Sequence, residues 1–216
     1  MNSHPAVRAF DAGAEPLTRR ALAKQRTRQR LLAAARKLIS ERGYDAATVR
    51  DIAAAADLST GAVFASFSDK AELFNEVILC DYARLLERMN ALSACDNSTR
   101  ATLVKLLAAA YAFHAEERSL VQAAISYSWS RSPAAERQAR EGLRAILARL
   151  EQVLRDGIQS GELAATLDAG LIAEMLWDSY IANWRRAIYE GWGVEALEAR
   201  IASQVEVLLD GYQIAA

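Results

Sequence analysis

The sequence is poor in the residues that build metal sites and disulfide frameworks. Cysteine occurs only at Cys80 and Cys95, and histidine only at His4 and His114, among 216 residues. Neither pair has the CxxC or HExxH spacing that zinc sites commonly use. Two cysteines are also too few for a disulfide scaffold. We therefore expect neither a metal nor any other cofactor.

Long apolar runs, glycine and proline are scarce as well. The longest stretch without a charged residue is 12 residues, Ser119 to Ser130, whereas a membrane-spanning helix needs about 20 apolar residues. The first residues lack the pattern of a signal peptide. Ten glycines and three prolines argue against collagen-like or Pro/Gly-rich disordered chains. GxSxG, P-loop and GxGxxG motifs are also missing. These features predict a cytoplasmic globular protein that is neither membrane-bound nor an enzyme.

The net charge of −1 conceals an uneven distribution. Residues 1–70 hold 12 basic and 7 acidic side chains, a net of +5, and the remaining 146 residues hold 14 basic and 20 acidic ones, a net of −6. Eight basic residues and no acidic one lie between Pro16 and Ser40. Such a segment attracts phosphates, although a solvated helix face has the same composition. The N-terminal third is therefore the candidate contact for a polyanion.

The apolar spacing is helical almost everywhere, and no long alternating run predicts a strand. We expect an all-α fold of about nine helices, with an N-terminal three-helix helix-turn-helix domain and a larger C-terminal helical bundle. The first helix ends at Gly43, a residue suited to the position after a helix. The other predicted helices cover 48–56, 60–67, 70–90, 99–116, 118–130, 134–160, 168–190 and 194–212.

Two short helices joined by a tight turn form the centre of the N-terminal region. Thr48 is a good cap for the first of them, with Asp51 facing its positive end. Asp57 tolerates the left-handed conformation that a tight turn needs, and Ser59 caps the next helix. This pattern predicts a helix-turn-helix, whose second helix is sized for the major groove of DNA.

A longer series of residues surrounds this motif: Thr27 to Ala35, Gly43-Tyr44, Thr48-Val49, Ile52-Ala53, Leu58 to Phe64, Phe67 and Lys70 to Leu73. With this series, residues 25–85 resemble the N-terminal domain of the TetR family of transcriptional regulators. The resemblance implies a homodimer on a palindromic double-stranded DNA operator, with repression favoured over activation and a C-terminal domain that binds a small effector. It divides the chain into a basic N-terminal arm over 1–24, the DNA-binding domain over 25–85 with its motif at 48–67, and an effector-binding and dimerisation domain over 86–216.

The resemblance also implies which residues face DNA. The candidates are Arg28, Thr48, Ser59, Thr60, Gly61, Phe64, Ser66 and Lys70. The family usually has Tyr where this chain has Phe64, His or Tyr where it has Ser66, and Gly where it has Asp57. Two phosphate contacts are thereby lost or shortened, and Asp57 adds negative charge. The basic residues between Arg19 and Arg30 are expected to compensate.

The C-terminal half is expected to supply an effector cavity and a dimer interface. Mostly apolar walls suit a hydrophobic or aromatic effector, whose charge the sequence leaves open: the acidic half favours a cation, whereas Arg185 and Arg186 favour an anion. A helical interaction or scaffold protein without DNA binding is the alternative, but it leaves the charge split unexplained. Predicted cavity residues are Tyr111, Phe113, His114, Tyr127, Trp129, Met175 and Trp177; predicted interface residues are Ile181, Trp184, Ile188, Leu197, Ile201, Val205 and Leu208.

Overall fold

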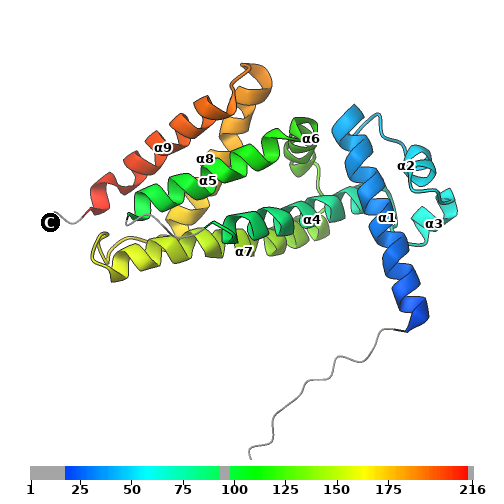
Figure 1. Ribbon diagram of the computed structural model, residues 1–216, viewed down its shortest axis with the longest axis horizontal. Helices are drawn as coiled ribbons and strands as arrows, with labels where there is room; N and C mark the ends of the chain where they lie inside the picture. The colour runs from blue at the N-terminus through cyan, green and yellow to red at the C-terminus, as the bar shows by residue number, and fades with distance from the viewer. Residues whose placement is uncertain (1–17, 93–97, 214–216) are drawn as a thin grey trace, which may run out of the picture.

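The computed structural model describes residues 18–92 and 98–213, and over these ranges the chain folds into nine α-helices (Figure 1). The predicted all-α class and the helix-turn-helix arrangement are confirmed. Among the described residues, no helix combines the length and the apolar character needed to cross a membrane. The helices are α1 (Arg19–Arg42), α2 (Val49–Ala55), α3 (Thr60–Phe64), α4 (Lys70–Asn90), α5 (Thr99–Ala115), α6 (Arg118–Ser128), α7 (Pro133–Gln159), α8 (Ala169–Tyr189) and α9 (Val194–Leu209).

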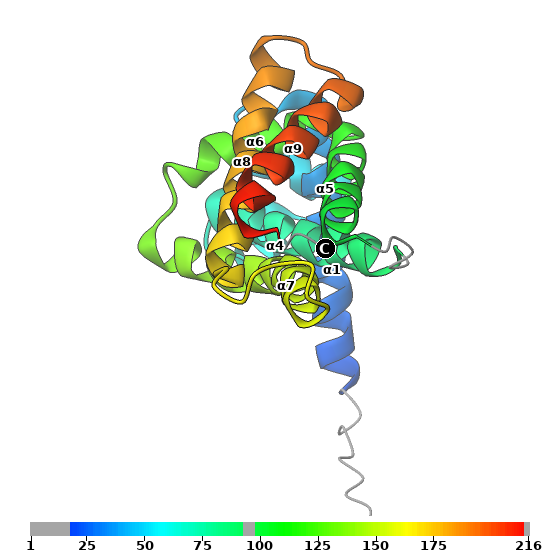
Figure 2. The same cartoon turned by 90° about the vertical axis from the view of Figure 1, so that its left-hand side faces the viewer.

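Helix α1 is longer than expected and absorbs the end of the predicted arm. It begins at Arg19, capped by the Thr18 hydroxyl, and it stops at Gly43, the predicted end, where φ is 81°. The rest of the predicted arm, 1–17, lies outside the described residues. Figures 1 and 2 show that the first part of α1 projects beyond the other helices. The basic residues of this segment therefore lie on an exposed helix.

Two hydrophobic cores hold the molecule together. The N-terminal core joins α1 to α4 around Leu31, Ile52 and Phe74, all fully buried. The C-terminal core joins α5, α7, α8 and α9 to the second half of α4. Helices α4 and α6 contribute side chains to both cores. A displacement of either helix in the C-terminal core must therefore also disturb the DNA-binding domain.

The apolar stripes of α8 and α9 pack mainly inside the chain rather than at its surface. Trp184, Leu197, Ile201 and Val205 are completely buried in the C-terminal core. These four predicted interface residues are therefore core residues of a single chain. Periodicity misassigned them because a stripe that packs against a neighbouring helix has the same spacing as one that packs against a second subunit. Ile181, Ile188 and Leu208 are partly buried.

Candidate nucleic-acid interface and ligand cavity

The helix-turn-helix is built from local hydrogen bonds that the sequence specifies. The Thr48 hydroxyl accepts from the Asp51 amide at 3.1 Å, and the Asp51 carboxylate accepts from the Thr48 amide at 3.2 Å. The Thr48 hydroxyl also donates to the Asp51 carboxylate at 2.6 Å, and the bonds from this hydroxyl and from the Thr48 amide lower the pKa of Asp51. Ser59 caps α3 by accepting from the Ala62 amide at 3.2 Å. Asp57 has a φ of 53°, so the turn adopts the predicted left-handed conformation.

Five of the eight predicted DNA-facing residues are exposed around α2 and α3. Thr48, Ser59, Thr60, Gly61 and Phe64 are all exposed, and the Phe64 ring keeps 58% of its surface in solvent. An aromatic ring that protrudes this far from a five-residue helix gains little from the protein's own core. Val63 and Phe67, by contrast, are buried in the N-terminal core.

The other three predicted DNA contacts are bound within the domain. Arg28 donates to the Ser66 carbonyl at 2.6 Å, pairs with Glu76 at 2.8 Å and lies over the Phe67 ring. Ser66 is itself half-buried and donates to a helix carbonyl. The tertiary structure therefore gives Arg28 and Ser66 positions inside the domain that the sequence does not reveal.

Lys70 is bound in a similar way. Its ammonium group donates to the Tyr44 carbonyl and lies 4.2 Å from the centroid of the Tyr44 ring. The pKa of Lys70 is lowered overall, because burial lowers it by more than the nearby Asp45 raises it. Much of the donor capacity of this lysine is therefore already used inside the protein.

Arg30 compensates for the negative charge of Asp57. Its guanidinium donates to the Ala56 carbonyl at 2.5 Å and to the Asp57 carbonyl at 3.3 Å, and it lies 3.5 Å from the Asp57 carboxylate. This fully exposed carboxylate thus faces a cation from α1. The exposed basic residues on the first turns of α1, Arg19, Arg20, Lys24 and Arg26, extend the positive surface.

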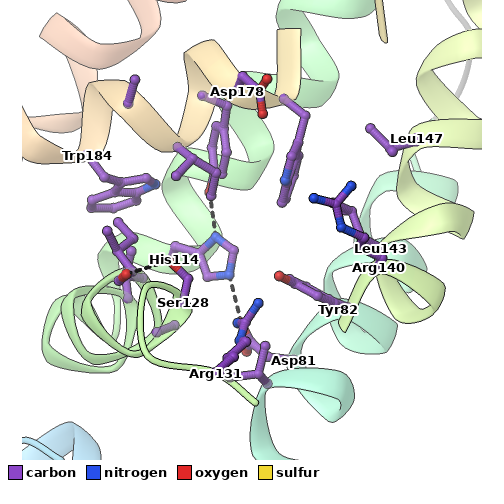
Figure 3. A pocket seen from close by; sticks show the side chains of 18 of the residues that line it. Asp81, Tyr82, His114, Ser128, Arg131, Arg140, Leu143, Leu147, Asp178 and Trp184 are labelled. Carbon is purple, nitrogen blue, oxygen red and sulfur yellow. Dashed lines mark hydrogen bonds and ion pairs between the residues drawn. The ribbon is translucent and has the colours of Figure 1, made fainter. Parts of the chain in front are cut away.

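A cavity of about 810 Å³ lies in the C-terminal domain, between α4, α6, α7 and α8, with one wall from α5. Three of the seven predicted residues line it: His114, Trp129 and Trp177. Apolar side chains such as Leu143 and Leu147 of α7 cover much of the remaining wall (Figure 3). The volume falls within the range of small-molecule sites, about 300–1,000 Å³.

The other four predicted cavity residues lie elsewhere. Tyr111 is buried behind Tyr180, with ring centroids 4.5 Å apart, and Phe113 is buried in the C-terminal core. Tyr127 packs against the N-terminal core, and Met175 is exposed on α8. The sequence identifies these side chains as apolar or aromatic, but the packing of the helices determines whether a given side chain faces the cavity or the core.

A buried polar network connects one cavity wall to α1. The Asp81 carboxylate of α4 accepts from Arg36 of α1 at 2.8 Å through one oxygen and lies 2.7 Å from His114 Nε2 through the other. His114 Nδ1 lies 2.5 Å from the Tyr180 hydroxyl, and Arg36 also binds Glu117 (Figure 3 shows the bonds of His114). Burial by itself raises the pKa of Asp81, but the bonds from His114 and Arg36 outweigh it and lower the pKa.

Sequence reasoning missed this network because its members are far apart in the chain and have no motif spacing. His114 was predicted as a cavity residue, and it does line the cavity together with Asp81 and Tyr180. Its two ring nitrogens are both engaged, one by a carboxylate and one by a hydroxyl. The ring therefore connects the cavity to the ion pair that holds α1.

Comparisons with known proteins agree with these features. The family of bacterial regulatory proteins called tetR matches residues 31–77. The repressor AcnR of Corynebacterium efficiens is 41% identical over 64 residues, which are 30% of this chain and 34% of AcnR. The chain thus matches about a third of the length of that relative. The regulator UidR of Escherichia coli is 27% identical over 158 residues, covering 71% of this chain and 78% of UidR.

Solved structures match over most of the chain. The transcriptional regulator FadR of Bacillus subtilis, solved in complex with stearoyl-CoA, has a TM-score of 0.72 at 21% identity, covering 85% of this chain and 98% of FadR. A TetR-family regulator from Mesorhizobium loti has a TM-score of 0.70 at 22% identity, covering 88% of this chain and 98% of its own. These likenesses concern the fold, and the named relatives are regulators rather than enzymes. Residues 31–77 therefore match the tetR family of bacterial regulatory proteins, and most of the chain shares its fold with these solved regulators.

Proposed function

We propose that this protein is a transcriptional repressor that binds a palindromic DNA operator as a homodimer and is released by a small effector. The observation that carries the proposal is the exposed surface of Thr48, Ser59, Thr60, Gly61 and Phe64, next to the basic start of α1. Hydroxyls and backbone amides of this kind donate to phosphate, and an exposed ring contacts base edges or sugars.

Dimerisation would use the outer faces of α8 and α9. Leu171, Met175 and Tyr189 of α8 and Val207 of α9 are the exposed large apolar residues there. The first two lie one helical turn apart, and on α9 the exposed Ser203 and Ala199 lie one and two turns before Val207. Apolar residues on neighbouring helices favour a helical interface between subunits. This surface replaces the predicted one, most of which is buried within a single chain.

The network of Arg36, Asp81, His114 and Tyr180 supplies a route for effector release. His114 and Tyr180 line the cavity, and His114 holds the Asp81 carboxylate that binds Arg36 of α1. A ligand that favours another position of His114 therefore favours another position of α1. The DNA-binding helices of the two subunits would then no longer match successive major grooves.

Selection of bound sequences from random double-stranded DNA tests the proposal. The full-length protein should enrich a palindrome, and the double variant Thr60→Ala/Phe64→Ala should lose that enrichment. Arg137→Ala, an exposed change on α7 outside the cavity lining, is the matched control and should enrich the same site. If the unmodified protein enriches no palindrome, the alternative function, a helical interaction or scaffold protein without DNA binding, becomes the better one.

A further inference from the structure

The strongest unassigned feature of the cavity is the side chain of Arg131. This residue follows α6, lines the cavity and keeps only 8% of its side-chain surface in solvent. Its Nε is buried and has no acceptor within the part of the chain that the structure describes. Buried N–H groups are almost always paired, and an unpaired donor on a cation is especially costly. The guanidinium therefore keeps an unused donor at the cavity wall, beside its partners Glu136 and Tyr82.

The charges around Arg131 do not balance locally. Glu136 is the acidic partner of Arg131, at 3.3 Å, and it also accepts from Arg140 at 2.8 Å. One carboxylate is thus shared by two guanidinium groups. Asp81, the nearby carboxylate of α4, already pairs with Arg36 and His114. One further carboxylate would bring the cluster of Arg131, Arg140 and Glu136 to neutrality.

The remaining acidic residues of the cavity lie on another wall. Glu174 and Asp178 are on α8 and exposed to solvent, and Figure 3 shows Asp178 on the opposite side of the view from Arg131. Arg144 and Arg185 also line the cavity and are exposed. Exposed charges are screened by water, whereas the buried end at Arg131 is not. The buried end therefore decides which charge a bound ligand carries.

Another part of the cavity wall is apolar. Leu143 and Leu147 of α7 and Trp177 and Ile181 of α8 line the cavity with Val121 of α6. A ligand that fills this space and also reaches Arg131 needs an apolar body and a single anionic end. The planar guanidinium edge matches a carboxylate better than it matches a hydroxyl or an ammonium group.

We propose that the effector is an amphipathic monocarboxylate whose carboxylate accepts from Arg131 and whose apolar body lies against α7 and α8. The inference rests on the proposed ligand-controlled repressor and specifies the chemical class that it senses. It resolves the charge that the sequence leaves open, because the buried cation at the end of the cavity is Arg131 rather than Arg185 or Arg186.

Binding of three ten-carbon probes to the full-length protein tests the inference: decanoate, 1-decanol and decylammonium at pH 7, measured by titration calorimetry. Decanoate should bind at least about tenfold more tightly than 1-decanol, the size expected for one charge-assisted hydrogen bond to a buried group. Decylammonium should bind more weakly than either. In Arg131→Met, which keeps the volume of the side chain, decanoate should lose this advantage while 1-decanol binds as before.

Two further variants distinguish the effect of removing the Arg131 charge from an effect on folding. Arg131→Lys should retain part of the preference for decanoate, and the matched control Arg137→Met, outside the cavity, should retain all of it. Equal binding of decanoate and 1-decanol, tighter binding of decylammonium, or no binding of any probe would overturn the inference. If the protein still selects a palindrome in any of these cases, only the ligand class is wrong, whereas loss of palindrome selection overturns the proposed function itself.

Discussion

Replacing Asp81 with Ala should destabilise the protein more than any single surface change. The carboxylate accepts from Arg36 at 2.8 Å and lies 2.7 Å from His114, and all three side chains are at most 16% exposed. Removing one partner of a buried ion pair costs about 3–5 kcal/mol. Because Arg36 keeps Glu117, we expect the lower value, about 3 kcal/mol. In a chain of this length that loss lowers the melting temperature by about 6–12 °C.

Thermal and urea unfolding followed by circular dichroism measure this loss. Lys37→Ala is the control, since Lys37 and Glu41 form a 4.0 Å pair on the exposed side of α1, and exposed pairs contribute less than about 1 kcal/mol. The double variant Arg36→Ala/Asp81→Ala should cost clearly less than the sum of the single variants. A loss below about 1 kcal/mol for Asp81→Ala, or strict additivity with Arg36→Ala, would refute the role of the network.

The pH dependence has a defined sign. The folded-state pKa of Asp81 lies below its ordinary value because His114 and Arg36 outweigh the effect of burial. A carboxylate with a lowered folded pKa contributes stability above its unfolded pKa, about 4, and loses it as the pH falls through the folded value. The stability difference between the unmodified protein and Asp81→Ala should therefore stay constant from pH 7 to pH 5 and shrink below about pH 4.

Four single changes test the fold, the DNA surface and the dimer. Gly157→Ala would place a Cβ 2.2 Å from the Thr99 hydroxyl oxygen. Alanine has the better helix propensity, but because of this clash we expect the free energy of unfolding, measured in urea, to fall by about 1 kcal/mol. Phe64→Ala should leave stability within about 0.5 kcal/mol but weaken operator binding roughly tenfold in fluorescence anisotropy; unchanged affinity would remove this ring from the interface. Asp57→Gly should raise the free energy of unfolding by up to about 1 kcal/mol, because the φ of 53° at this position is left-handed and suits glycine. A lower urea midpoint would show instead that the carboxylate stabilises the turn. Val207→Glu should yield monomers in sedimentation velocity, and a persistent dimer would place the interface elsewhere.

The sequence predicts the helical elements well because their signals are local. Thr48, Ser59 and Asp57 were predicted to cap and turn the helix-turn-helix, and each does so by bonds or dihedral angles within three residues. The observed helix bounds differ from the predicted ones mainly where the local capping and periodicity signals are weak. Helix α1 extends back to Arg19 through a basic segment without apolar periodicity, and α3 ends at Phe64 rather than near Phe67.

The direction in which a side chain faces is less predictable. Arg28 and Lys70 are basic residues of the DNA-binding domain, yet each binds a carbonyl and lies over a ring of that same domain. Trp184 and Ile201 have the periodicity of an interface, yet both are completely buried in the C-terminal core of a single chain. In each case the partner is distant in the chain, so no local pattern identifies it.

The sequence by itself determined the all-α class, the helix-turn-helix and the concentration of positive charge before residue 70, because capping, periodicity and composition act over a few residues. Only the tertiary structure decided which aromatic residues line the cavity, that Asp81 joins Arg36 to His114, and that the buried Nε of Arg131 lacks an acceptor. These features depend on the approach of α1, α4, α5 and the segment after α6. A buried charge needs a partner, whereas an exposed charge is solvated by water. Whether a side chain is buried depends on the assembled helices rather than on any one of them.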